Sequence, residues 1–150
     1  MNIKQRPMPN ILLICSNIHK DLAAEQLDLC SSLVKKADYD YQVELLEAGT
    51  YEIPFVINAY HQKNSFDAYL ALGLVLQADS NHYNDIMTHI RYCFTQFALN
   101  NIIVGNGIIS APHMDILKER VENGERVEEA INAVDYLIRF KNKYKTTAYA

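Results

Sequence analysis

Cysteine is scarce in this chain of 150 residues, which contains three cysteines and no tryptophan. Cys15, Cys30 and Cys93 are odd in number, far apart in the sequence and surrounded by apolar residues. This distribution excludes a disulfide framework and does not match the ligand spacing of a zinc site. We therefore expect reduced, buried thiols. The histidines share no ligand spacing either, so we predict no metal site.

The sequence also lacks a long apolar run and an excess of positive charge. No apolar stretch approaches the length of a membrane span. Near the N-terminus, Pro7, Pro9 and Asn10 interrupt the chain before any long signal-peptide core. The 14 Lys and Arg residues are outnumbered by 18 Asp and Glu, which leaves a net charge of −4 and no basic stripe for a nucleic acid. We expect a cytoplasmic protein that has neither a membrane nor a nucleic acid as its partner.

What the chain does have is the composition of an ordinary globular domain, with 49% hydrophobic and 21% charged residues. Its length suits one domain with a real core. The sequence shows no internal repeat, low-complexity segment or linker. Residues 1–9, which include Pro7 and Pro9, are expected to form a flexible or edge-pairing arm. Residues 10–150 are expected to form the single domain.

Apolar runs alternate with helical periodicity along the chain. This alternation predicts strands over 11–15, 41–46, 68–75 and 102–109, and helices over 22–37, 52–62, 81–100, 113–121 and 127–143, with a helix stop at Asn123-Gly124. It implies a parallel sheet with helices on both faces, joined by right-handed crossovers. Ligands bind beyond the carboxyl ends of such strands. The turns at 16–19, 48–52, 77–82 and 106–111 should therefore form the site.

The stretch from Ala71 to Tyr83 is the candidate centre of that site. Its apolar run ends in a short polar turn, after which a helix begins. Unpaired N–H groups and the helix dipole make such a helix start an anion site. Ser80 is a good N-cap that could hold a phosphate, and His82 is placed to exchange protons with a ligand. Taken alone, a histidine here is more often an exposed helix-start residue than a catalyst.

Further motifs lie on both sides of this stretch. They are Gly49-Thr50-Tyr51-Glu52-Ile53-Pro54, Arg120 and Val127-Glu128-Glu129-Ala130. With Ala71–Tyr83, in this order and spacing, they resemble the 6,7-dimethyl-8-ribityllumazine synthase family. The matching family patterns are Gly-Ala-Phe/Tyr-Glu-Ile-Pro, Ala-Leu-Gly-x-Val-Ile-x-Gly-Glu/Asp-Thr/Ser-x-His-Phe/Tyr, an arginine at a fixed step after the fourth strand, and a Val-Glu-Ala-Ala-like helix. The resemblance covers roughly residues 10–140.

The resemblance implies a flavodoxin-like three-layer sandwich with a four-stranded parallel sheet. It implies an enzyme of riboflavin biosynthesis that condenses 5-amino-6-(D-ribitylamino)uracil with 3,4-dihydroxy-2-butanone 4-phosphate. The amine attacks the ketone to give an imine, phosphate is eliminated, and the second carbonyl closes the ring with loss of water. No metal or organic cofactor is required. The resemblance further implies a homopentamer, or a multiple of pentamers, whose active sites are shared between neighbours.

By position, the resemblance assigns proton transfer to His82 and phosphate binding to Asp79, Ser80 and Arg120. The other implied substrate contacts are Ile18, Thr50, Tyr51, Glu52, Leu74, Val75, Leu76 and Asn106. Residues 50–52 would hold the ribityl chain, and residues 74–76 would edge the pyrimidine through their backbone. Ile18 takes the place of a ring-stacking aromatic and Asn106 that of an aromatic from the adjacent subunit. Asn106 and Arg120 would thus serve the next subunit's His82.

The chain departs from the family pattern at several positions. Ile18 and Asn106 replace aromatics, Ala78 replaces a glycine, and Arg126 is a candidate for a lysine that is absent. One alternative is therefore a degenerate family member that binds a flavin or a lumazine without turnover. Another is a generic flavodoxin-like regulator with no affinity for phosphate.

Simpler interpretations of single residues also stay open. Arg120 alone fits a surface helix cation, and Glu52 alone fits a carboxylate that faces a helix dipole. Tyr51 fits packing as well as ligand contact. Without tryptophan, the ten tyrosines indicate amphipathic contacts at a surface or an interface.

Overall fold

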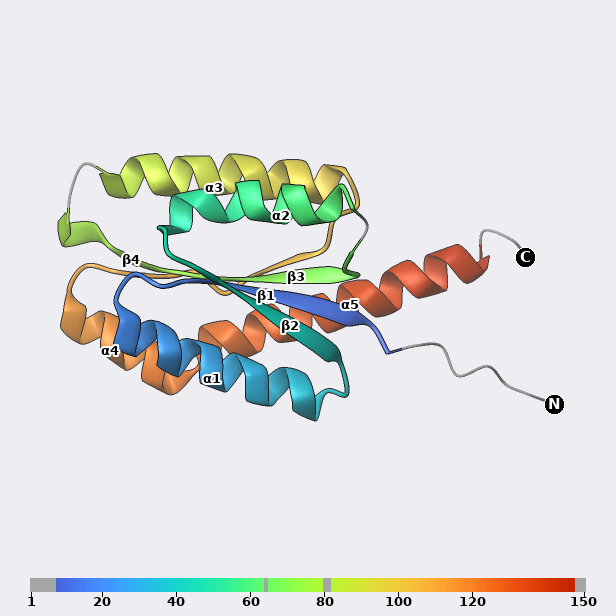
Figure 1. The fold of residues 1–150 in the computed structure, drawn as a ribbon, viewed down its shortest axis with the longest axis horizontal. Coiled ribbons are helices and arrows are strands. Elements are labelled where there is room, and N and C mark those ends of the chain that lie inside the picture. Colours follow the sequence, from blue (N-terminus) through green and yellow to red (C-terminus); the bar gives the residue numbers. More distant parts are fainter. Residues whose placement is uncertain (1–7, 64, 80–81, 148–150) are drawn as a thin grey trace.

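A four-stranded parallel sheet forms the central layer of the fold (Figure 1). The structure is a computed structural model that describes residues 8–63, 65–79 and 82–147. The strands of this sheet are β1 (Asn10–Ser16), β2 (Asp40–Leu46), β3 (Ala68–Leu72) and β5 (Val104–Asn106), in the order β2-β1-β3-β5. The strand order reverses between β1 and β3, and ligands bind beside such a reversal in open α/β sheets.

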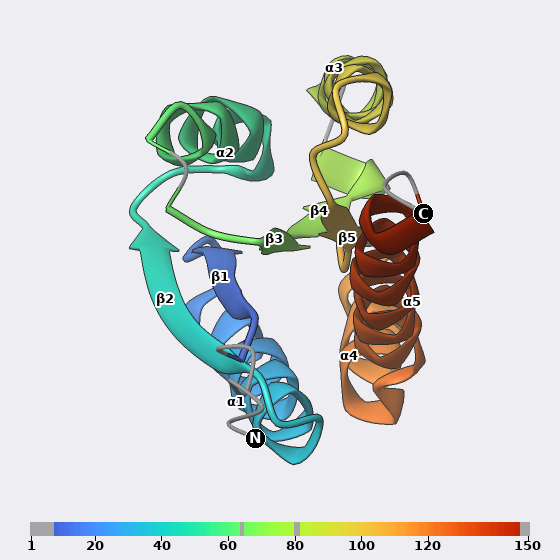
Figure 2. The same cartoon turned by 90° about the vertical axis from the view of Figure 1, so that its right-hand side faces the viewer.

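Helices cover both faces of this sheet (Figure 2). One face carries α1 (Lys20–Lys36), α4 (Met114–Asn123) and α5 (Glu125–Thr147). The other face carries α2 (Ile53–His61) and α3 (His82–Leu99). Two short 3-10 turns, η1 (Thr50–Glu52) and η2 (Gln77–Asp79), precede α2 and α3. The predicted three-layer sandwich with a four-stranded parallel sheet is confirmed.

β1 divides its side chains between two hydrophobic cores. Ile11, Leu13 and Cys15 belong to the core beneath α1, α4 and α5. Leu12 and Ile14 belong to the core beneath α2 and α3. Burial on both faces explains the unbroken apolar run that predicts this strand. β2 lies at the edge of the sheet, as its alternating pattern suggests.

The predictions of single strands over 68–75 and 102–109 are wrong. β3 ends at Leu72, and the chain continues as a separate strand, β4 (Leu74–Leu76). β5 likewise gives way to β6 (Ile109–Ala111). β4 and β6 pair in parallel and form a second, two-stranded sheet.

Both interruptions occur at glycines whose backbones approach other atoms closely. A Cβ on Gly73 would lie 2.5 Å from the Oγ1 of Thr50, and one on Gly107 would lie 2.9 Å from the carbonyl oxygen of Ala71. The Gly107 N–H donates to that same carbonyl at 2.9 Å. Leu72 and Leu74 flank Gly73, and apolar residues lie on both sides of the Gly105-Asn106-Gly107 stretch, so the apolar runs conceal these breaks in the sequence.

The helix stop predicted at Asn123-Gly124 is confirmed. α4 ends at Asn123, and Gly124 adopts the left-handed conformation with φ 70°. α5 then begins at Glu125, two residues before the predicted start at Val127. Most of the arm expected at 1–9 lies outside the described residues. Within the ranges that the structure describes, no helix is both long and apolar enough to cross a membrane.

Candidate active site

β4 leads into the turn where the anion site is predicted. η2 ends at Asp79 and α3 begins at His82. Ser80 and Asn81 lie outside the described residues, as does the side chain of Asp79. The phosphate roles of Asp79 and Ser80 therefore stay predictions. His82 is exposed at the first position of α3, which fits both a simple helix-start residue and a side chain that meets a ligand.

A cavity of about 1040 Å³ opens beside His82. The turn after β1, the η1 turn and the first half of α3 surround it. Its lining residues are Ile18, Gly49, Thr50, Tyr51, Glu52, His82, Asn84, Asp85, Ile86, Thr88, His89 and Tyr92. We call it the His82 cavity. The fold thus brings the predicted proton carrier together with Ile18 and with the three residues predicted to hold the ribityl chain.

Residues 50–52 meet the His82 cavity in different ways. Thr50 is buried, and its hydroxyl and methyl groups lie over Gly73. Tyr51 is 48% exposed, and its ring stacks on the imidazole of His89 with 3.9 Å between centroids and 19° between planes. Glu52 is exposed. A ligand can therefore reach the side chains of Tyr51 and Glu52 more readily than that of Thr50.

The turn between β1 and α1 supplies another wall of the cavity. Ser16 anchors its start, because the Ser16 hydroxyl donates to the carbonyl of Ala48 at 2.7 Å. His19 adopts a left-handed conformation with φ 61° and ψ 61°, which costs a non-glycine residue about 1 kcal/mol or more. Ile18, the residue before His19, is exposed on the cavity wall.

A second cavity, of about 400 Å³, lies beside β6, α4 and the start of α5. Its lining residues are Met87, Asn106, Ile108, Ile109, Ser110, Arg120, Asn123, Glu125, Arg126 and Glu129. We call it the Arg120 cavity. Arg120 Nη1 donates to the carbonyl of Ser110, and Arg126 Nε donates to the carbonyl of Ile108 at 3.3 Å. Two guanidinium groups at one cavity suit an anion such as phosphate. Glu125 and Glu129 line the same cavity, and Glu129 Oε2 lies 3.9 Å from Arg126 Nη1.

The predicted site is divided between these two cavities. Asn106 and Arg120 line the second cavity, whereas His82 lines the first, and the two cavities share no lining residue. Residues 74–76 of β4 line neither cavity. Within one chain, the structure therefore does not bring the proton carrier and the phosphate-binding arginine into a common cavity.

Tyr83 connects the elements that carry the two cavities. Its side chain hydrogen-bonds to Gln77 and to Ser110, and these bonds lower the pKa of Tyr83. Ser110 contacts Arg120 as well, because its carbonyl accepts a hydrogen bond from Arg120 Nη1. The start of α3 is thus linked through β6 to the arginine, a connection that the sequence pattern did not reveal.

Sequence reasoning also missed the face of α3 that lines the His82 cavity. Asp85, Ile86, His89 and Tyr92 follow His82 on this face. Residues three, four and seven positions apart lie on one side of a helix. Extending the helical period from His82 would therefore have found this face.

The three cysteines are free. Burial raises the pKa of Cys15 to about 11 and, together with the nearby Cys15, that of Cys30 to about 12, so both remain thiols at neutral pH. Cys93 is only partly buried and lies 3.6 Å from Nδ1 of His89. In the described part of the chain, no group of three or more histidine, cysteine or acidic side chains could hold a metal ion.

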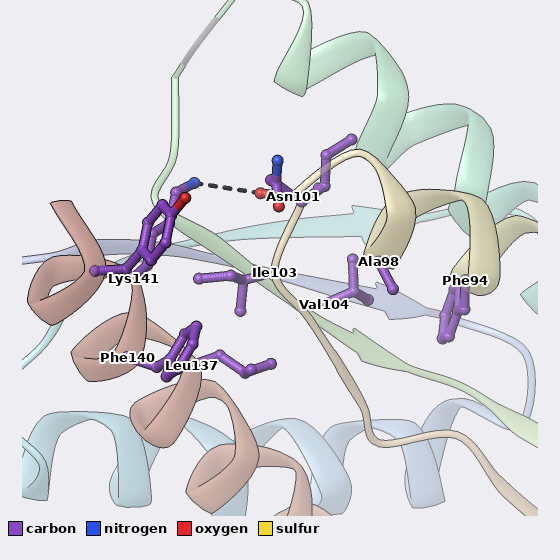
Figure 3. Close-up of a pocket in the computed structure, with 10 residues that line it drawn as sticks. Phe94, Ala98, Asn101, Ile103, Val104, Leu137, Phe140 and Lys141 are labelled. Atoms are coloured by element: carbon purple, nitrogen blue, oxygen red, sulfur yellow. Dashed lines mark hydrogen bonds between the residues drawn. The ribbon is translucent and has the colours of Figure 1, made fainter. Parts of the chain in front are cut away.

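A third cavity, of about 570 Å³, lies where the chain enters β5 (Figure 3). Its wall is mainly apolar, and Phe94 from α3 faces it together with Leu137 and Phe140 from α5. Lys141 Nζ donates to the carbonyl of Asn101 at its rim, at 3.2 Å. This is the amino end of β5, opposite to the end where ligands bind in parallel sheets.

Comparison with known proteins identifies a family for most of the chain. Residues 9–142 match the sequence model of the family described as 6,7-dimethyl-8-ribityllumazine synthase. A protein of that name from Jannaschia sp. (strain CCS1) is 27% identical over 115 residues, which are 76% of this chain and 64% of the relative. The match thus spans less than two thirds of that relative's length.

Two further relatives carry the same name. The protein from Bartonella tribocorum is 23% identical over 125 residues, which are 82% of each chain. The protein from Sphingopyxis alaskensis is 21% identical over 139 residues, which are 91% of this chain and 98% of the relative. The family resemblance stated from the motifs is confirmed.

Proposed function

We propose that this chain, which belongs to the 6,7-dimethyl-8-ribityllumazine synthase family, condenses 5-amino-6-(D-ribitylamino)uracil with 3,4-dihydroxy-2-butanone 4-phosphate. The products are 6,7-dimethyl-8-ribityllumazine, inorganic phosphate and water, in a step of riboflavin biosynthesis. The observation that carries the proposal is the family match over residues 9–142. The cavity that joins His82 to the turn at residues 49–52 supports it.

The His82 cavity is assigned the pyrimidine and the proton transfers. The 5-amino group of the pyrimidine attacks the ketone carbon, and loss of water leaves an imine. His82 donates and accepts protons during this step and during the loss of phosphate. The exposed side chains of Tyr51 and Glu52 would bind the hydroxyl groups of the ribityl chain. Holding the two substrates in reactive geometry supplies much of the acceleration.

The Arg120 cavity is assigned the phosphate of the second substrate. The Arg120 guanidinium is anchored on the carbonyl of Ser110, so its remaining N–H groups can bind phosphate oxygens. Arg126 lies in the same cavity and is the candidate for the family lysine that this chain lacks. Asp79 and Ser80 would add contacts from the turn before α3, mainly through backbone N–H groups.

A shared site would unite the two cavities. We propose a homopentamer, or a multiple of pentamers, in which Arg120 and Asn106 of one subunit complete the His82 cavity of its neighbour. The separation of the two cavities within one chain supports this arrangement. The arrangement also gives a role to residues that a monomer would leave apart. Light scattering at micromolar concentration should give five chain masses or a multiple of five.

The protein is expected to act in the cytoplasm. Its three cysteines are free, and Cys15 and Cys30 are buried without a disulfide partner. Free, buried thiols are typical of reducing compartments. Localisation of the tagged protein in cells of its source organism tests this expectation.

The decisive experiment is an assay for the lumazine. The purified protein is incubated with both substrates, and the chromophore of the product is followed against the uncatalysed reaction. We expect a clear excess with the protein present. No excess at saturating substrate would overturn the proposal. If calorimetry then showed tight flavin binding, a binder without turnover would be supported instead.

A further inference from the structure

Gln26 is a buried polar residue on an otherwise apolar face of α1. Its exposed fraction is 1%, and its buried neighbours on this helix are Ala23, Cys30 and Val34. Gln26 Nε2 donates to the carbonyl of Gly107 at 2.7 Å, across a sequence separation of 81 residues. The contact therefore joins α1 to the point where β5 gives way to β6.

The amide of Gln26 is not what packing alone would select. Its Oε1 is buried and has no hydrogen-bond partner among the described residues. A buried acceptor without a partner destabilises a protein, whereas a methionine or leucine of similar size would avoid this cost. The bond to Gly107 is thus the feature that distinguishes glutamine from an apolar residue at this position.

Gly107 is the first residue of a short backbone segment, residues 107–110, that we call the crossover segment. Its carbonyls at Gly107, Ile108 and Ser110 all accept hydrogen bonds from side chains. The donors are Gln26 Nε2, Arg126 Nε and Arg120 Nη1, respectively. The two arginines that line the Arg120 cavity and the buried glutamine therefore bind the same four-residue segment.

The other side of the crossover segment is fixed by the strand beside it. The N–H of Gly107 donates to the carbonyl of Ala71 at 2.9 Å, and the N–H of Ile109 donates to the carbonyl of Gly73 at 2.8 Å. Gln26 binds the segment from the direction of α1. Without it, the Gly107 carbonyl would lose its acceptor bond inside the core, and the segment could relax toward α1.

We propose that Gln26 is a positioning residue for the phosphate site. It holds the crossover segment, the segment holds the guanidinium groups of Arg120 and Arg126, and these groups bind the phosphate of the substrate. The inference rests on the proposed function, because that function assigns phosphate to the Arg120 cavity. The ligand that the Arg120 cavity would bind is a phosphate monoester or inorganic phosphate.

The test is Gln26→Met, which keeps the volume and the apolar contacts but removes the donor. We expect the dissociation constant for inorganic phosphate, measured by calorimetry on the assembled protein, to rise about three- to tenfold, the order of one lost hydrogen bond. The KM for 3,4-dihydroxy-2-butanone 4-phosphate should rise by a similar factor. The KM for the pyrimidine and kcat should stay within about twofold, because the His82 cavity is untouched.

Cys30→Ala is the matched control. Cys30 is fully buried on the same face of α1, one turn further on, and lines neither the Arg120 cavity nor the His82 cavity. The Cys30→Ala variant should have a lower free energy of unfolding but an unchanged affinity for phosphate. A phosphate dissociation constant within twofold of the parent in Gln26→Met would overturn the inference. An equal loss of affinity in both variants would also overturn it, since loosening of the core would then be the cause.

A measurement on the unaltered protein serves if Gln26→Met does not fold. Coupling between two events is reciprocal, so saturating inorganic phosphate should slow hydrogen exchange of the Gln26 side-chain amide several-fold. The exposed amide of Gln42 is the reference. Unchanged exchange at Gln26 would overturn the inference. Absence of lumazine formation would instead count against the proposed function, and phosphate binding can be measured in either case.

Discussion

The two cavities differ in how their functional groups are held. In the His82 cavity, the exposed side chains of His82, Tyr51 and Glu52 project from a helix start and a 3-10 turn. In the Arg120 cavity, both guanidinium groups are bound to backbone carbonyls of one segment. The side chains proposed for proton transfer and ribityl binding are thus exposed, while the arginines proposed for phosphate binding are already hydrogen-bonded to the backbone. Pre-fixed charges stabilise an anion without further ordering on binding.

The largest effect is expected from His82→Ala. Loss of a positioned general acid and base should lower kcat by about a hundredfold, within the usual range for such groups. The KM for 3,4-dihydroxy-2-butanone 4-phosphate should change little, because the proposal assigns phosphate to the other cavity. Steady-state kinetics measures both values. His113→Ala is the control, because His113 lies outside both cavities, and an equal loss there would contradict the role of His82.

Mixing two impaired variants tests whether the cavities combine between chains. His82→Ala and Arg120→Ala subunits, unfolded together in equal amounts and reassembled, should recover about one quarter of the parent activity at a concentration of the phosphorylated substrate well below its KM, if each site takes one residue from each neighbour. Either variant reassembled alone should show only its own low activity at that concentration. Activity of the mixture no higher than the mean of the separate variants would contradict a shared site.

Arg120→Ala tests the phosphate-binding role proposed for the Arg120 cavity. Removal of a charge-assisted phosphate contact should raise the KM for the phosphorylated substrate about twentyfold. The KM for the pyrimidine should remain near that of the parent. Lys118→Ala is a matched control, because Lys118 is an exposed cation of the same helix that lines neither cavity. A similar rise in the control would indicate a general effect of surface charge.

Two glycine substitutions, one in the crossover segment and one beside the His82 cavity, should differ in their effect on the free energy of unfolding. Gly107→Ala should lower the free energy of unfolding by about 2 kcal/mol, because its Cβ would meet the Ala71 carbonyl at 2.9 Å. At Gly49, beside the His82 cavity, the nearest atoms lie 3.5 Å from an added Cβ, so Gly49→Ala should be nearly neutral. Denaturant unfolding measures both. Equal losses of unfolding free energy in the two variants would show that the backbone is equally confined at Gly107 and at Gly49.

The smallest effect is expected from Ile18→Phe. An aromatic ring on the exposed wall of the His82 cavity should stack on the pyrimidine and lower its KM about threefold. The KM for the phosphorylated substrate should be unaffected. Weaker pyrimidine binding in this variant would show that residue 18 does not face the ring.

The sequence predicts best what depends on local pattern. The strand at 11–15 is evident because β1 is buried on both faces, and the end of α4 is evident because Gly124 must adopt a positive φ. The His82 cavity follows from motifs that are each continuous in the chain. What could not be predicted depends on distant contacts. Only the fold brings Gln26 to Gly107, and only the fold shows that two apolar runs are each divided at a glycine.

The pairing of β4 with β6 has a consequence for an assembled ring. β4 leads to His82 and β6 leads to the helix that carries Arg120, so this two-stranded ladder joins the two cavities of each chain. In the proposed ring, those cavities belong to successive active sites. The ladder then acts as a rigid spacer that sets the distance from one site to the next. Insertions or exchanges in the turns around His82 can alter one site while its spacing from the neighbouring site is preserved.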